Sequence, residues 1–111
     1  MTRYQAFVDR LRAAVLGAGQ SSVAVRKAAL ARARQVSGRA DGAKLESALD
    51  PDLERWVEKV ARHAYTTTDR EIAELRTAGY SEDQIFEITV AAALGAAQAR
   101  AECALEALEQ S

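Results

Sequence analysis

Residues 81–109, SEDQIFEITVAAALGAAQARAECALEALE, decide the fold of this chain. The stretch opens with a capping-box pattern, in which Ser81 and Gln84 satisfy each other's backbone N–H groups. The helical pattern then continues without a break to about Glu109, which is about 28 residues or about 42 Å of helix. Glycines fall mainly where helices should stop, and no alternating run of β-branched residues occurs. These features predict an all-α fold with a long, alanine-rich C-terminal helix.

The middle of this helix, AAALGAA at residues 91–97, leaves little side chain on any face. Gly95 costs about 1 kcal/mol relative to alanine inside a helix, so we expect a second helix backbone to approach closely there. Two interpretations are open. We favour a subunit or central-bundle interface, because the helix is too long for a globule of 111 residues to cover alone. The alternative is an ordinary alanine-rich core helix.

The composition bounds the size and setting of the protein. The 111 residues predict a single domain, and 25 of them are alanine, so a lone monomer would have a thin core. No apolar run approaches the roughly 20 residues that span a membrane, and the charged N-terminus does not read as a secretory signal. Cys103 is the single cysteine, which excludes an internal disulfide framework and a cysteine-cluster metal site. We therefore expect a soluble, cytoplasmic protein without a metal or cofactor.

Charge is divided between the two halves of the chain. Residues 1–49 carry nine Lys or Arg against three Asp or Glu, and residues 50–111 carry six against thirteen. Such a division indicates that the halves face each other, within one subunit or between subunits. Nucleic-acid binding is the less favoured alternative, because the most basic segment, VRKAALARAR at residues 25–34, has no aromatic side chain to stack on bases.

Two helices are expected in the basic N-terminal extension, residues 1–49. The first covers residues 2–16, with Thr2 as N-cap and with Gly17 and Gly19 ending it in the left-handed conformation. The second begins at Ser21 or Ser22 and reaches residue 36, and residues 37–42 form a loop. The side chains expected to face inward are Phe7, Leu11, Ala14, Val15, Val23 and Leu30.

The second half, residues 50–111, contains the predicted helical core. Asp50 is the expected N-cap of a helix that starts at Pro51. Thr68 and Glu71 form a second capping-box pattern, which opens a short helix that Gly79 ends. The side chains expected to face inward are Leu53, Trp56, Val57, Val60, Ala64, Ile72 and Leu75.

Residues 57–108 resemble the alkylhydroperoxidase D and carboxymuconolactone decarboxylase superfamily. The resemblance rests on Thr68-Asp69, on LRTAGYSEDQIFEI at residues 75–88 and on Arg100. It implies an all-α fold that assembles into trimers or hexamers. Active hydroperoxidases of the family carry a Cys-x-x-Cys-x-x-x-His motif, but its positions fall here on Ala64, Thr67 and Glu71, or on a segment without cysteine. The resemblance therefore implies a member without the redox dithiol, acting on a small organic acid or lactone.

Five residues are candidates for such chemistry. His63 is the only histidine and the natural proton-transfer group, with Tyr65 and Glu58 beside it. Arg100 matches an arginine of the family's long helix and could hold a substrate carboxylate, and Trp56 could line the pocket. Each also has a structural interpretation: a histidine at a helix end, a core aromatic residue or an ion-paired side chain.

Cys103 lies among glutamates late in its helix, which disfavours a thiolate, so we interpret it as a small buried residue. Two functions remain open. One is an enzyme, which a pocket containing His63 would favour. The other is a non-catalytic oligomeric or partner-binding module, which a packed interior with a solvent-facing His63 would favour.

Overall fold

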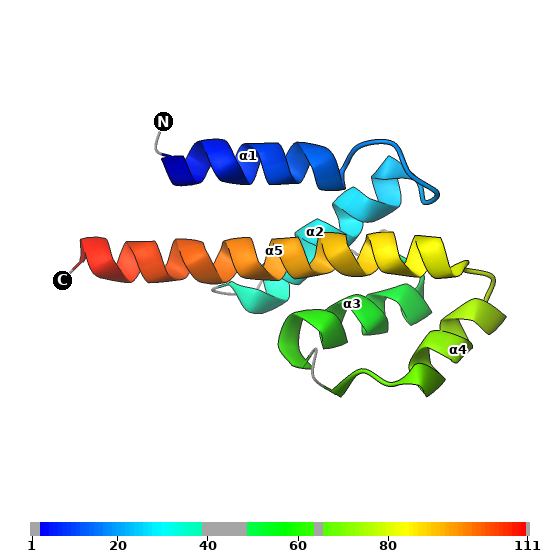
Figure 1. Cartoon of the computed structure of the whole chain (residues 1–111). Helices are drawn as coiled ribbons and strands as arrows, with labels where there is room; N and C mark the ends of the chain where they lie inside the picture. Colours follow the sequence, from blue (N-terminus) through cyan, green and yellow to red (C-terminus); the bar gives the residue numbers. More distant parts are fainter. Residues whose placement is uncertain (1–2, 39–48, 64–65, 111) are drawn as a thin grey trace.

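A single long helix, α5 (Glu82–Glu109), is the axis on which the rest of the molecule packs. The computed structural model describes residues 3–38, 49–63 and 66–110. Within these residues α1 (Arg3–Val15), α2 (Val23–Ser37), α3 (Pro51–His63) and α4 (Asp69–Thr77) accompany α5, and no strand is present. The helices form one all-α domain, as the sequence predicts. Figure 1 shows α1 alongside α5, α2 crossing behind α5, and α3 and α4 on the side of α5 away from α1.

Both predicted capping boxes are present. The Ser81 hydroxyl accepts the N–H of Gln84 at 3.1 Å, and the Gln84 side-chain oxygen accepts the N–H of Ser81 at 2.9 Å. Thr68 and Glu71 make the equivalent pair of contacts at the start of α4. Because these bonds satisfy otherwise unpaired donors, they fix where both helices begin. Gly79 has a φ of 111° and allows the turn between α4 and α5.

The smooth middle of α5 packs against α2 of the same chain. A Cβ added at Gly95 would lie 2.3 Å from the Leu30 carbonyl oxygen, so glycine is required for the two backbones to come this close. The small residues of α5 buried in this region are Ala91, Ala92, Gly95, Ala96 and Ala99. This stretch is therefore a contact between helices in the central bundle of the single chain, as one of the expected forms of the interface, and the assembly of several copies stays a prediction.

Helix α3 completes the core by packing against both α2 and α5. Its predicted inward residues Leu53, Trp56, Val57 and Val60 are all buried, whereas Ala64 lies outside the described residues. The backbone carbonyl of Asp50 accepts the N–H of Glu54 at 2.8 Å, which starts the helix. The Asp50 carboxylate accepts the hydroxyl of Tyr80 at 2.6 Å instead of a helix N–H. Burial and this carboxylate raise the pKa of Tyr80 to about 12.

The predicted inward face of α1 is confirmed only at Val15, which packs against the core. Val8 is buried, whereas Phe7 is 54% exposed and Leu11 is 38% exposed. In α2, Leu30 is buried as predicted, but Val23 is 39% exposed. The spacing of apolar residues predicts which side chains share one face of a helix, but it does not predict which face a neighbouring helix will cover. Here α5 is the one described helix on which α1 packs, so much of the surface of α1 stays exposed.

The turn between α1 and α2 also differs from expectation. Neither Gly17 nor Gly19 has a positive φ, so the predicted left-handed helix end is absent there. Gly19 instead leaves room for a side chain of α5: a Cβ there would lie 2.6 Å from the carboxylate of Glu87, which would have to shift. Ser22 caps α2 by accepting the N–H of Val25 at 3.1 Å. The predicted cap Thr2 and most of the predicted loop at residues 37–42 lie outside the described residues.

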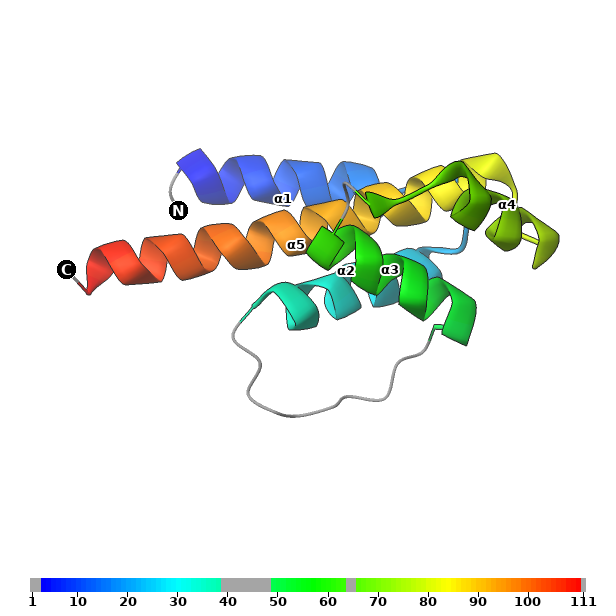
Figure 2. The same cartoon turned by 90° about the horizontal axis from the view of Figure 1, so that it is seen from below.

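The two termini lie at the same end of the molecule, where α5 projects beyond α2 and α3 (Figures 1 and 2). There α5 is exposed, with Leu105 44% and Leu108 69% accessible to solvent. The basic and acidic halves do meet inside one chain, because ion pairs join Arg32 of α2 to Glu58 of α3 and Arg34 of α2 to Glu102 of α5. None of the described helices has the length and apolarity needed to cross a membrane.

Candidate functional site

The C-terminal end of α3 brings together two of the predicted functional residues. Arg100 of α5 donates a hydrogen bond through Nη2 to the carbonyl oxygen of Ala61, two residues before His63. The hydroxyl of Thr66 donates to the His63 carbonyl at 2.8 Å. The negative end of a helix dipole favours a cation and a donor in these positions. The His63 side chain is exposed, and Arg100 here serves as a cap for α3.

Glu58, the second predicted catalytic residue, faces α2 and not the C-terminal end of α3. It accepts a hydrogen bond from Arg32 of α2, and the same guanidinium lies 3.4 Å from Glu54. Glu58 and His63 are five residues apart, which separates them by about 140° around the helix. The carboxylate therefore joins α2 to α3 and does not face His63. Tyr65, the third predicted catalytic residue, lies outside the described residues.

Trp56 is part of the core. It is 6% exposed, and its indole N–H donates to the hydroxyl of Thr89 at 2.8 Å. Thr89 in turn donates to the Ile85 carbonyl at 2.6 Å. A buried tryptophan with a satisfied N–H contributes apolar area and fixes its own orientation. The structural interpretation of Trp56 therefore fits its surroundings.

One edge of Trp56 nevertheless lines a hollow of about 350 Å³ between α3 and α4. Lys59 and Glu71 form an ion pair across it at 2.6 Å, and this bond to Lys59 is the main cause that lowers the pKa of Glu71. Arg55 pairs with Asp52 at its rim. Both cations that line this hollow, Arg55 and Lys59, are thus already paired. The predicted site residues His63, Glu58 and Arg100 are not among its lining residues.

A second hollow, of about 650 Å³, lies between α1, α2 and α5. It is strongly polar, and its lining includes Arg12 and Lys27, which have no carboxylate within ion-pair distance in the described part of the chain. The sequence interpretation missed this site. The available signal was the polar stripe Gln5, Asp9 and Arg12 on α1, spaced four and three residues apart, which puts these side chains on one helix face. The full lining consists of Gln5, Asp9, Arg12, Lys27, Leu30, Ala31, Arg34, Gln35, Gln98 and Glu102.

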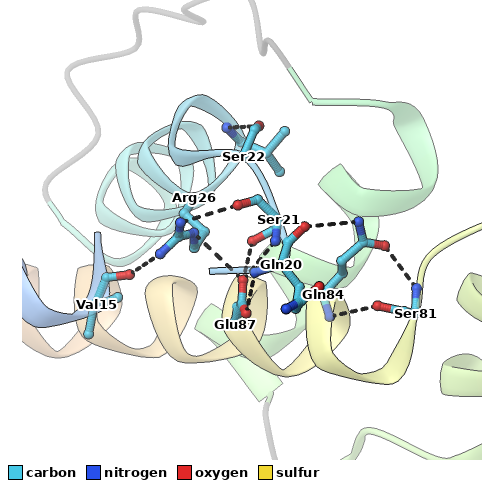
Figure 3. A network of polar contacts seen from close by, with 9 residues as sticks. Val15, Gln20, Ser21, Ser22, Arg26, Ser81, Gln84 and Glu87 are labelled. Carbon is cyan, nitrogen blue, oxygen red and sulfur yellow. Dashed lines mark hydrogen bonds and ion pairs between the residues drawn. The ribbon is translucent and has the colours of Figure 1, made fainter. Parts of the chain in front are cut away.

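Glu87 is the centre of a network that holds the α1–α2 turn on α5 (Figure 3). Its carboxylate accepts the N–H groups of Gln20 and Ser21, both at 2.8 Å, and the Ser21 hydroxyl at 2.7 Å. These bonds, together with the Arg26 charge, lower the pKa of Glu87 to about 2. Arg26 is 2% exposed and donates to the carbonyls of Val15 at 2.7 Å and Ser21 at 3.2 Å. Apart from the Nε of Arg26, which is buried 3.9 Å from the Glu87 carboxylate without a hydrogen bond, these groups are occupied with one another, so the network is structural.

The remaining candidate, Cys103, is half-buried near the exposed end of α5 rather than fully buried. The residues described by the structure contain no group of three His, Cys, Asp or Glu side chains arranged to hold a metal ion.

Comparisons with known proteins identify no relative of this chain. No protein-family model, no curated protein and no solved structure matches it. The resemblance to the alkylhydroperoxidase D superfamily therefore stays a prediction, and the geometry above is the basis for assigning a function.

Proposed function

We propose that the protein is a non-catalytic oligomeric module, which binds a second copy of itself through α1 and the exposed end of α5. The observation that carries this proposal is the distribution of large apolar side chains. Phe7 and Leu11 of α1 and Leu105 and Leu108 of α5 are between 38% and 69% exposed, while the buried residues of α5 from Ala91 to Ala99 are mostly alanine and glycine. Exposed apolar side chains gathered at one end of a molecule are typical of association surfaces.

Charge supports a second copy as the occupant. Helix α1 carries Arg3, Arg10 and Arg12 against Asp9. Residues 101–109 of α5 carry no basic residue and three glutamates, of which Glu102 pairs with Arg34 of the same chain. The N-terminus of α1 and the C-terminus of α5 lie at the same end of the molecule (Figure 1). The basic α1 of one copy can therefore meet the acidic end of α5 of another, and the reverse contact forms at the same time. Such a reciprocal contact closes on itself by two-fold symmetry.

The family resemblance implies trimers or hexamers, and a hexamer can be assembled from three such pairs. We place the protein in the cytoplasm, because its one thiol can form no internal disulfide.

Light scattering coupled to size-exclusion chromatography tests the proposal. We expect the native protein to form an oligomer at micromolar concentration and the double variant Leu105→Ser/Leu108→Ser to be monomeric. The matched control is Phe86→Ser, because Phe86 is 67% exposed but lies near the other end of α5. A native protein that is monomeric throughout this range, or a control that dissociates as fully as the double variant, would refute the proposal.

A second candidate function is acid–base chemistry on a small organic acid or lactone, as expected of a carboxymuconolactone decarboxylase-like protein without the dithiol. The observation in its favour is that Arg100 and His63 lie at the same end of α3. Arg100 would hold the carboxylate and His63 would transfer the proton. The test is turnover of a carboxylated γ-lactone followed by NMR, with loss of activity expected in His63→Ala and Arg100→Gln. Absence of turnover in the native oligomer would exclude this function for that substrate class.

A further inference from the structure

We propose that the hollow between α1, α2 and α5 binds a small hydroxylated oxyanion, such as a hydroxycarboxylate. The hollow exists because α1 and α2 both pack on α5 and not on each other. The two helices meet at the turn after α1 and diverge from it (Figures 1 and 2). The residues facing the space between them are mostly polar, although apolar side chains would have closed it.

The charges in the hollow favour an anion. Arg12 and Lys27 approach it from different helices, and neither forms an ion pair with a described carboxylate. Arg34, the third cation, is held in a two-bond contact with Glu102 at 3.1 and 2.7 Å. A guanidinium and an ammonium directed at one space from two sides can hold a carboxylate or phosphate group, because the bonds they make are charge-assisted.

The floor of the hollow adds a second, independent indication. Gln98 lines it and is 8% exposed, and its side-chain oxygen has no hydrogen-bond partner in the described part of the chain. Buried amides normally have their hydrogen bonds satisfied. This oxygen is buried in the structure, but the terminal amide torsion of glutamine is broad, so rotation of the amide can turn it toward the hollow, where it would accept a bond from a ligand hydroxyl. Asp9 offers a further acceptor on the α1 side. The site therefore combines anion-binding cations with acceptors for hydroxyl groups.

Isothermal titration calorimetry at fixed ionic strength tests this site with two probes, citrate and tricarballylate, which differ only in the hydroxyl group of citrate. We expect citrate to bind more tightly than tricarballylate. Arg12→Gln and Lys27→Gln should each weaken citrate binding by about tenfold, since each removes one charge-assisted contact. Gln98→Leu should remove the preference for citrate. The matched control is Arg10→Gln, an exposed arginine of the same helix that does not line the hollow.

Three results would overturn the inference: no binding of either probe at millimolar concentration, equal weakening by Arg10→Gln and the two lining variants, or equal affinity for the two probes. The titration is repeated in the Leu105→Ser/Leu108→Ser background. Since the lining belongs to one chain, we expect citrate binding to persist there even if the protein does not self-associate. Loss of binding only in that background would contradict a site built from a single chain.

Discussion

The two parts of α5 have opposite environments, although they belong to one continuous helix. From Ile85 to Ala99 the helix is buried by α2 and α3, mostly through alanine and glycine side chains. From residue 100 onward it is largely exposed, and there it carries the large side chains Leu105 and Leu108. Small residues thus mark the part of α5 that packs on α2, although the rest of the core contains large side chains such as Trp56 and Ile88, and the projecting end of α5 keeps its large apolar side chains in solvent. Side-chain hydrophobicity alone would therefore predict that Leu105 and Leu108 are buried and that the alanine-rich middle of α5 is exposed.

Truncating one large side chain in each part gives the largest expected difference. Ile88 is 1% exposed, so Ile88→Ala should lower the free energy of unfolding by about 2–5 kcal/mol. Leu108→Ala should change it by less than about 0.5 kcal/mol, since an exposed side chain has little packing to lose. Urea unfolding of the dilute, monomeric protein measures both. Equal losses would show that the exposed end of α5 is packed as firmly as its middle.

Adding one methyl group at the α2–α5 contact tests the importance of small residues. Gly95→Ala should destabilise the protein by about 1–3 kcal/mol, because the new Cβ meets the backbone of Leu30 and one helix must shift. This loss exceeds the gain of about 1 kcal/mol that alanine gives in a free helix. The control is Ala97→Ser at an exposed position of the same helix. A stabilised Gly95→Ala variant would mean that α2 and α5 do not approach this closely.

Local chemistry explains which parts of the fold the sequence could predict. The capping boxes at Thr68 and Ser81 place both helix starts correctly, because their partners are only three residues away. The close approach at Gly95 was also expected, but its partner, α2 of the same chain, was not. In both cases the partner is remote in the sequence. Phe7 was wrongly expected to face inward, because the choice between Phe7 and Val8 depends on the position of α5, which follows 67 or more residues later in the sequence.

The candidate site was less predictable than the fold. The sequence singles out His63 and Arg100, and the structure does bring them to one end of α3, but it also gives Arg100 a backbone partner. Arg12 and Lys27 were not chosen as site residues, because isolated cations on helix surfaces are common. Only the packing of α1 and α2 on a shared neighbour reveals that these two charges face one hollow.

Acidification should weaken the attachment of the α1–α2 turn to α5, which depends on the ionised Glu87, before it affects contacts between uncharged side chains. The pKa of Glu87 is about 2 in the folded chain against an ordinary value of 4.5, because the N–H groups of Gln20 and Ser21 hold the ionised form. The stability that it contributes is therefore present above the ordinary pKa and is lost as the pH falls toward 2. The slope of the unfolding free energy against pH measures how many more protons the unfolded state binds than the folded state. We expect Glu87→Gln to reduce that number by up to about one in this window.

The control for this measurement is Asp83→Asn, an exposed carboxylate in the first turn of the same helix. Parallel slopes for the native protein and Glu87→Gln would mean that the turn between α1 and α2 is not held by this carboxylate.

The smallest expected effect lies at the boundary between the two parts of α5. Arg34 and Glu102 form the last described ion pair between α2 and α5, and both side chains are at least one-third exposed. Exposed pairs contribute about 0.2–1 kcal/mol and are screened by salt. Glu102→Gln should therefore lower stability by less than about 1 kcal/mol in low salt, and the difference should vanish in high salt. A larger loss that salt leaves unchanged would show that the buried part of α5 extends past residue 102, and that the free end begins nearer to Leu105.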